Sequence, residues 1–134
     1  MWKLFNKFIS PKNFYYFSER CFIYLTIPCV ILLFSGIFSG LWIAPADYQQ
    51  GDGFRIIYIH APSAFISMGI YLAMAFSALL SLVWRTKISA MWMCVSAPIG
   101  AWFSFLTLFT GSIWGKPMWG TWWIWDARLT SALV

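Results

Sequence analysis

Charged side chains are scarce in this sequence. Only 10% of its 134 residues are Asp, Glu, Lys or Arg, whereas a soluble domain carries about 25%. Apolar residues make up 61% and aromatic residues 22%, which is more apolar surface than a soluble domain of this length can bury. The same composition excludes intrinsic disorder, which requires low hydrophobicity. The sequence therefore predicts an integral membrane protein, with residues 1–134 forming a single domain.

Cysteine and histidine are also rare. The three cysteines, Cys21, Cys29 and Cys94, form no C-x-x-C pair, which excludes a zinc knuckle, a dithiol redox pair and a covalent c-type haem attachment site. All three lie in apolar segments, so we interpret them as small hydrophobic residues. The sequence shows no catalytic triad, phosphate-binding loop or carboxylate pair, and we expect a binding protein rather than an enzyme.

Long uncharged runs are what the sequence has in abundance. They contain 26, 29 and 28 residues and lie between Arg20 and Asp47, between Arg55 and Arg85, and between Lys87 and Lys116. About 20 residues of helix cross a bilayer, so each run predicts one crossing. The first run exceeds the 7–15 residues of a signal-peptide core and is interpreted as a retained helix. The expected fold is all-α, with three transmembrane helices at about residues 21–45, 56–84 and 88–115.

Lysine and arginine predict how these helices are oriented. Six of the nine precede the first run or lie in the turn after the second: Lys3, Lys7, Lys12, Arg20, Arg85 and Lys87. The positive-inside rule then places the N-terminus and the 85–87 turn in the cytoplasm or matrix, and residues 46–55 and 116–128 outside. This distribution makes membrane lipids, and not nucleic acid, the expected partner.

Two further expectations concern helix starts. Pro62 is expected to open the body of the second helix, with residues 54–61 forming an interfacial turn before it. Residues 127–134 are typical of the first turns of a fourth helix, too short to span a membrane. We therefore expect the chain to be the first part of a longer protein, or a truncated product.

Tryptophan is concentrated near the end of the sequence. Four tryptophans fall within seven residues, at Trp119, Trp122, Trp123 and Trp125. Two interpretations remain open: an aromatic belt at the membrane surface, or a shelf for a flat ligand such as a porphyrin or a quinone. If the stretch is helical, Trp119, Trp122, Trp123 and Asp126 share one face and Trp125 points elsewhere.

Ionisable residues complete the candidate site. Asp126 is expected to N-cap a helix that begins at Ala127. Arg128 either binds a ligand carboxylate or snorkels to the interface, and at an i, i+2 spacing it is not expected to face Asp126. His60, the single histidine, is predicted on the same side of the membrane as the tryptophans, as an iron ligand or as a histidine bonded to a neighbouring helix. Met118 is a weaker candidate for a second iron ligand.

The run from Trp119 to Ser131, WGTWWIWDARLTS, resembles the tryptophan-rich "WWD" signature of haem-handling proteins in cytochrome c biogenesis. The Tyr-Ile-His-Ala-Pro context of His60 and the order of the segments make the whole sequence most similar to the haem exporter protein C family of the cytochrome c maturation system. The resemblance implies that His60 is an axial ligand of haem b and that residues 119–131, Gly120 included, form the haem platform.

The resemblance also implies a function in haem binding and delivery at the outer face of an inner membrane, bacterial or mitochondrial. The expected partners are a periplasmic haem chaperone, cytochrome c maturation protein E, an ABC transporter pair and a small membrane subunit. Family members have six membrane helices and a second ligand histidine, whereas this sequence has three predicted helices and one histidine. The alternatives are a quinone- or lipid-binding redox subunit and a non-functional truncated scaffold.

Overall fold

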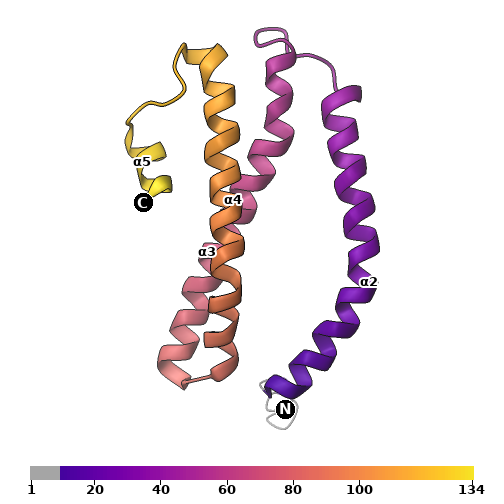
Figure 1. Ribbon diagram of the computed structural model, residues 1–134, viewed down its shortest axis with the longest axis vertical. Coiled ribbons are helices and arrows are strands. Elements are labelled where there is room, and N and C mark those ends of the chain that lie inside the picture. Colours follow the sequence, from indigo (N-terminus) through magenta and orange to yellow (C-terminus); the bar gives the residue numbers. More distant parts are fainter. Residues whose placement is uncertain (1–9) are drawn as a thin grey trace.

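The protein is an all-α membrane protein, as predicted. A computed structural model describes residues 10–134, so Lys3 and Lys7 lie outside the described part of the chain. In order, the elements are α2 (Pro11–Phe38), the π-helical turn η1 (Ser39–Ile43), the 3-10 turn η2 (Asp52–Ile56), α3 (Ile57–Trp84), α4 (Lys87–Trp119) and α5 (Ala127–Leu133). Figure 1 shows α3 and α4 crossing as a pair, with α2 on one side and α5 on the other.

Helices α3 and α4 form an antiparallel hairpin that makes most of the contacts between elements. The residues buried in these two helices are small or carry hydroxyl groups: Ser63, Ser67, Ser89, Ser96, Gly100, Thr110 and Gly115. Across the pair, Ser67 Oγ lies 2.7 Å from Ser104 Oγ. Within residues 10–134 no hydrophobic side chain is buried. Close packing through small residues, with hydroxyls bonding across helices, is how membrane helices associate.

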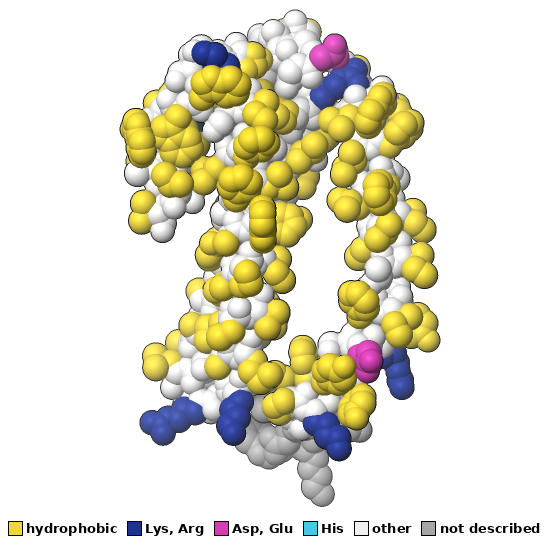
Figure 2. Space-filling model, in the orientation of Figure 1, with side chains coloured by type: hydrophobic (Ala, Val, Ile, Leu, Met, Phe, Trp, Pro, Cys, Tyr) yellow, Lys and Arg dark blue, Asp and Glu magenta, His cyan; other side chains and the backbone are white. Residues whose placement is uncertain are grey.

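Helix α2 and η1 pack against the hairpin near the start of α3. A Cβ on Gly40 would lie 2.7 Å from the Cβ of Tyr58, so only glycine allows this approach. Arg55 links η1 and η2 at the same place. Its guanidinium donates a hydrogen bond to the Leu41 carbonyl, and its Nε donates to Asp52 Oδ1 at 3.0 Å. Farther along, Figure 2 shows an opening between α2 and the α3–α4 pair.

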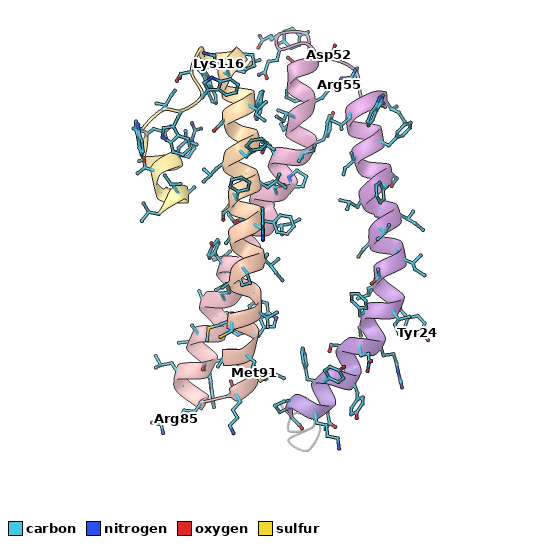
Figure 3. The ribbon with its side chains drawn as sticks, viewed as in Figure 1. Tyr24, Asp52, Arg55, Arg85, Met91 and Lys116 are labelled. Carbon is cyan, nitrogen blue, oxygen red and sulfur yellow. The ribbon has the colours of Figure 1, made fainter. Side chains whose placement is uncertain are left out.

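Within residues 10–134, three segments of 33 residues each are long and apolar enough to cross a membrane: Pro11–Ile43, Asp52–Trp84 and Lys87–Trp119. Hydrophobic side chains cover the middle of the molecule, and lysine and arginine lie at its two ends (Figure 2). In Figure 3, Arg85 marks one end and Arg55, Asp52 and Lys116 mark the other. The number of predicted spans is therefore confirmed.

The predicted helix boundaries need correction. The first helix begins at Pro11, ten residues before its predicted start, and proline suits the first helical position. The third continues past residue 115 to Trp119, where Gly120 ends it with φ 75°. Pro62 lies inside α3, which begins at Ile57, so the prediction that Pro62 opens this helix was wrong.

Candidate functional site

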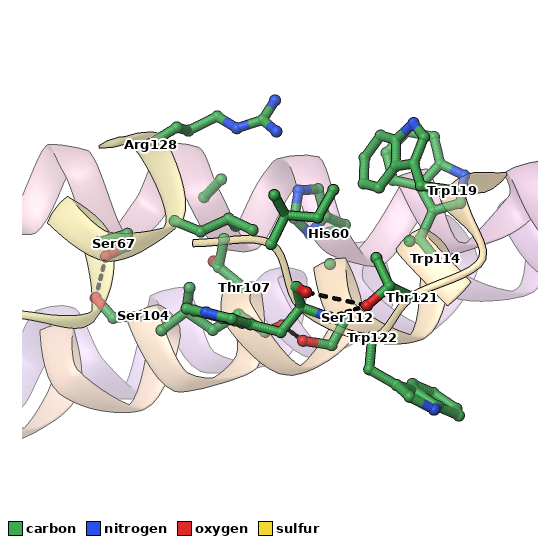
Figure 4. A pocket seen from close by; sticks show the side chains of 18 of the residues that line it. His60, Ser67, Ser104, Thr107, Ser112, Trp114, Trp119, Thr121, Trp122 and Arg128 are labelled. Atoms are coloured by element: carbon green, nitrogen blue, oxygen red, sulfur yellow. Dashed lines mark hydrogen bonds between the residues drawn. The ribbon is translucent and has the colours of Figure 1, made fainter. Parts of the chain in front are cut away.

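A pocket of about 420 Å³ lies between the α3–α4 hairpin and the segment that follows α4. Its size falls within the range of small-molecule sites, about 300–1,000 Å³. Helix α3 contributes His60, α4 contributes Thr107, Gly111 and Trp114, and the end of the chain contributes residues 121–124 and Arg128. Figure 4 shows His60, Trp119 and Arg128 around this space. The structure thus brings together residues that the sequence places about sixty positions apart.

The tryptophan-rich segment reaches the pocket by a route that the sequence did not predict. Residues 120–126 are not helical. Glycine is suited to the left-handed conformation of Gly120, which lets the chain turn back beside α4 (Figure 1). The interpretation that residues 119–126 form one helical face was therefore wrong, although three of the four residues assigned to that face do lie together. Trp119, Trp122 and Trp123 line the pocket.

Trp125 and Gly120 do not line the pocket. The Trp125 side chain is 77% exposed, and its ring packs edge-on against that of Trp123 with centroids 5.7 Å apart. Gly120 serves the backbone turn, and its carbonyl accepts a hydrogen bond from Lys116 Nζ at 3.0 Å. Both residues therefore support the segment from outside the cavity.

Cations lie over the tryptophan rings at the pocket mouth. Lys116 Nζ is 5.8 Å from the ring centroid of Trp122, and the Arg128 guanidinium carbon is 6.0 Å from that of Trp119. Between exposed groups such contacts contribute about 0.5–1 kcal/mol each. The mouth therefore combines flat apolar surfaces with positive charge, which suits a planar ligand that carries carboxylates.

Asp126 N-caps α5, as predicted. Its Oδ1 accepts the Leu129 N–H at 2.7 Å. That hydrogen bond, assisted by the charge of Arg128, holds the pKa of the Asp126 carboxyl below its ordinary value. The expectation that Asp126 and Arg128 do not face each other was wrong, because Arg128 Nη2 lies 3.0 Å from Asp126 Oδ2. Asp126 has the extended backbone of a cap residue, so helical spacing does not apply to it.

His60 lies in the first turn of α3, where its ring packs between groups of α4. Its Nδ1 lies 3.0 Å from Thr110 Oγ1. The ring of Trp114 meets it edge-on at a centroid distance of 5.7 Å, and a Cβ on Gly111 would lie 3.1 Å from its Cε1. The bond to a neighbouring helix and the position in the pocket coexist, so the two interpretations of His60 do not exclude each other.

Thr110, Gly111 and Trp114 surround His60, and none of them was predicted as a site residue. Trp114 is itself held in place, because its Nε1 donates to Gln50 Oε1 at 2.9 Å. Gly111 and Gly115 have the G-x-x-x-G spacing that is a known signal of close helix packing. That spacing could have identified this part of α4 as a helix contact. Met118 does not line the pocket and points toward Gly53 instead.

One buried polar atom in the pocket wall has no partner. Trp123 Nε1 is inaccessible and makes no hydrogen bond within the described residues, 10–134. Unpaired buried donors are rare and costly. Among residues 10–134 no group of three or more His, Cys, Asp or Glu side chains could hold a bare metal ion. A ligand that brings its own iron-coordinating nitrogens needs only the one imidazole.

The fold and the pocket together define a multi-pass helical membrane protein with a tryptophan-lined pocket at one end of its helices. The family model described as Heme exporter protein C matches residues 4–134. Heme exporter protein C of Haemophilus influenzae is 52% identical over 137 residues, covering 100% of this chain and 54% of that protein. Its counterpart in Escherichia coli K12 is 51% identical, covering 100% of this chain and 55% of that protein.

A relative outside the bacteria is the "putative cytochrome c biosynthesis ccmC-like mitochondrial protein" of Marchantia polymorpha. It is 49% identical over 106 residues, which cover 79% of this chain and 46% of that protein. The chain belongs to the Heme exporter protein C family. It spans about half the length of these relatives.

Proposed function

We propose that this chain binds haem b in the pocket and presents it for delivery during c-type cytochrome biogenesis. The observation that carries the proposal is the convergence of His60, the tryptophans and Arg128 on one cavity. It is supported by the names of the relatives, which refer to heme export and cytochrome c biosynthesis. The protein acts by binding and transfer, with no catalytic group of its own.

The chemistry of the pocket fits a haem. His60 would ligate the iron, and Trp119, Trp122 and Trp123 would pack against the porphyrin. Arg128 at the mouth is placed to pair with a propionate. The indole N–H of Trp123 has no protein partner within residues 10–134, and the residue forms part of the pocket wall. Trp125, Gly120 and Asp126 hold the surrounding segment.

The charge distribution supports an orientation. Lys12 and Arg20 lie in the first part of α2, and Arg85 and Lys87 lie at the turn between α3 and α4. Both places are at the end of the molecule opposite the tryptophan-rich segment (Figure 1), and the positive-inside rule assigns that end to the cytoplasm. The pocket then faces the periplasm, or the intermembrane space of a mitochondrion. A haem chaperone of the cytochrome c maturation protein E type approaches from there, and the ABC subunits and the small membrane subunit contact the chain within and below the inner membrane.

A haem titration tests this function. The whole chain is purified in detergent, hemin is added, and Soret spectra are recorded in the oxidised and reduced states. We expect saturable binding that His60→Ala weakens strongly. Met118→Leu is the matched control, since Met118 lies outside the pocket. Far-UV circular dichroism verifies that each variant is folded, and acidified acetone should extract the haem, as expected for non-covalent haem b.

The alternatives give different results. If His60→Ala binds hemin with wild-type affinity and spectrum, the proposed ligation is wrong. Tight quinone binding together with that result favours a redox subunit. A scaffold whose tryptophans only anchor it shows neither saturable hemin binding nor a change in any ligand spectrum in a Trp122→Ala, Trp123→Ala double variant.

A further inference from the structure

The hydroxyl group of Thr110 makes three contacts that together determine where its proton lies. Thr110 is 5% exposed and its Oγ1 lies 3.0 Å from His60 Nδ1. The same oxygen donates to the carbonyl of Leu106 at 2.7 Å and lies 3.2 Å from the carbonyl of Thr107. A hydroxyl has one proton to donate and two lone pairs to accept with. Carbonyl oxygens only accept, and the Leu106 carbonyl is the nearest of the three partners, which favours donation of the single proton to the backbone of α4.

If the hydroxyl proton of Thr110 is donated to the backbone of α4, only one donor–acceptor arrangement is left for the contact with His60. The hydroxyl oxygen must accept, and the imidazole must donate from Nδ1. A neutral imidazole carries one N–H, so the lone pair then resides on Nε2. We propose that Thr110 is a positioning residue that fixes His60 as the Nδ1–H tautomer and thereby keeps Nε2 free to bind iron. This inference rests on the proposed haem function.

The surroundings of His60 favour this arrangement. Gly111 leaves room for the ring edge that carries Cε1 and Nδ1, since a Cβ there would lie 3.1 Å and 3.5 Å from these two atoms. Trp114 confines the ring from another side. The imidazole therefore presents its Nδ1 edge to α4. Metal-binding histidines generally donate their second ring N–H in this way, which sets the tautomer and the ring orientation.

The first experiment needs no haem. The chain has a single histidine, so ¹⁵N-histidine labelling gives one imidazole in the NMR spectrum of the whole protein, recorded above the pH at which that imidazole titrates. Imidazole ¹⁵N shifts distinguish the two tautomers. We expect Nδ1–H in the wild type and in Thr110→Ser, which keeps the hydroxyl. Thr110→Val, which removes it at nearly constant shape, should show a mixture or the Nε2–H form.

The control is Thr26→Val in α2. Thr26 makes the same kind of bond to its own helix, from Oγ1 to the Phe22 carbonyl at 2.6 Å, and it does not line the pocket. This variant should keep the wild-type tautomer. A wild-type spectrum with the proton on Nε2 overturns the inference outright, and this outcome needs no variant to fold.

The second experiment measures hemin affinity and the iron–histidine stretching frequency of the reduced complex. Thr110→Val should lower the affinity by about 10- to 100-fold, as loss of an outer-shell partner does at metal sites. Thr110→Ser should restore the affinity and the frequency. If His60→Ala weakens binding while Thr110→Val leaves tautomer, affinity and frequency unchanged, the positioning role is wrong and the haem function stands. If His60→Ala changes nothing, the haem function fails, and the tautomer result still decides the contact.

Discussion

Gly111→Ala tests how α4 holds the His60 ring, because the added methyl group should weaken hemin binding without lowering the stability of the fold. The new Cβ would lie 3.1 Å from His60 Cε1 and 3.5 Å from Nδ1. Ordinary carbon–carbon contact begins at about 3.5 Å, so the ring has to retreat by about 0.4 Å or more. Trp114 restricts the retreat on one side. The movement therefore strains the 3.0 Å contact between His60 and Thr110.

The expected loss follows from that contact. One hydrogen bond contributes about 1 kcal/mol on balance, which corresponds to roughly a fivefold loss of hemin affinity. Helix propensity acts in the opposite direction, because alanine in a helix interior is about 1 kcal/mol more favourable than glycine. Gly111→Ala should consequently fold at least as well as the wild type in the α4 region, yet bind hemin more weakly.

Gly69→Ala in α3 provides the matched control, since a Cβ there meets nothing within 4 Å. It should show the gain in helix stability with unchanged hemin binding. Both variants are compared by thermal unfolding in detergent and by hemin titration. Equal hemin affinity and identical Soret spectra for the two variants would refute the argument that α4 confines His60.

Three further predictions address orientation, the tryptophans and pH. In a variant without the native cysteines, a cysteine introduced at Tyr48, which is 90% exposed, should react with a membrane-impermeant thiol reagent in intact cells. A cysteine introduced at Thr86 should react only after the membrane is permeabilised. The reverse pattern contradicts the proposed orientation. Trp123→Leu should weaken hemin binding and Trp125→Leu should not, because only Trp123 lines the cavity. Because the folded-state pKa of Asp126 is lowered from 3.8, its capping of α5 is present above that value and lost as the pH falls through the lowered pKa. NMR shifts of the α5 amides should report this transition, and Asp126→Asn should abolish it.

Part of this site was predictable because it depends on local chemistry. An aspartate that caps the helix starting at Ala127 needs only its own side chain and the next few backbone groups. The choice of His60 and the tryptophans rested on residue type and on the predicted side of the membrane. The relation between Asp126 and Arg128 was missed because helical spacing was applied across a cap, where the backbone is extended.

The sequence by itself determined the membrane class and the number of spans within residues 10–134, because hydropathy adds up along the chain and about 20 apolar residues suffice to cross a bilayer. Only the tertiary structure decided that the tryptophan segment turns back at Gly120 and that His60 meets Thr110, fifty positions later. Such contacts depend on the rotation and register of two packed helices. Rotation and register depend on how the small residues of both helices meet, and the spacing within one helix does not determine them.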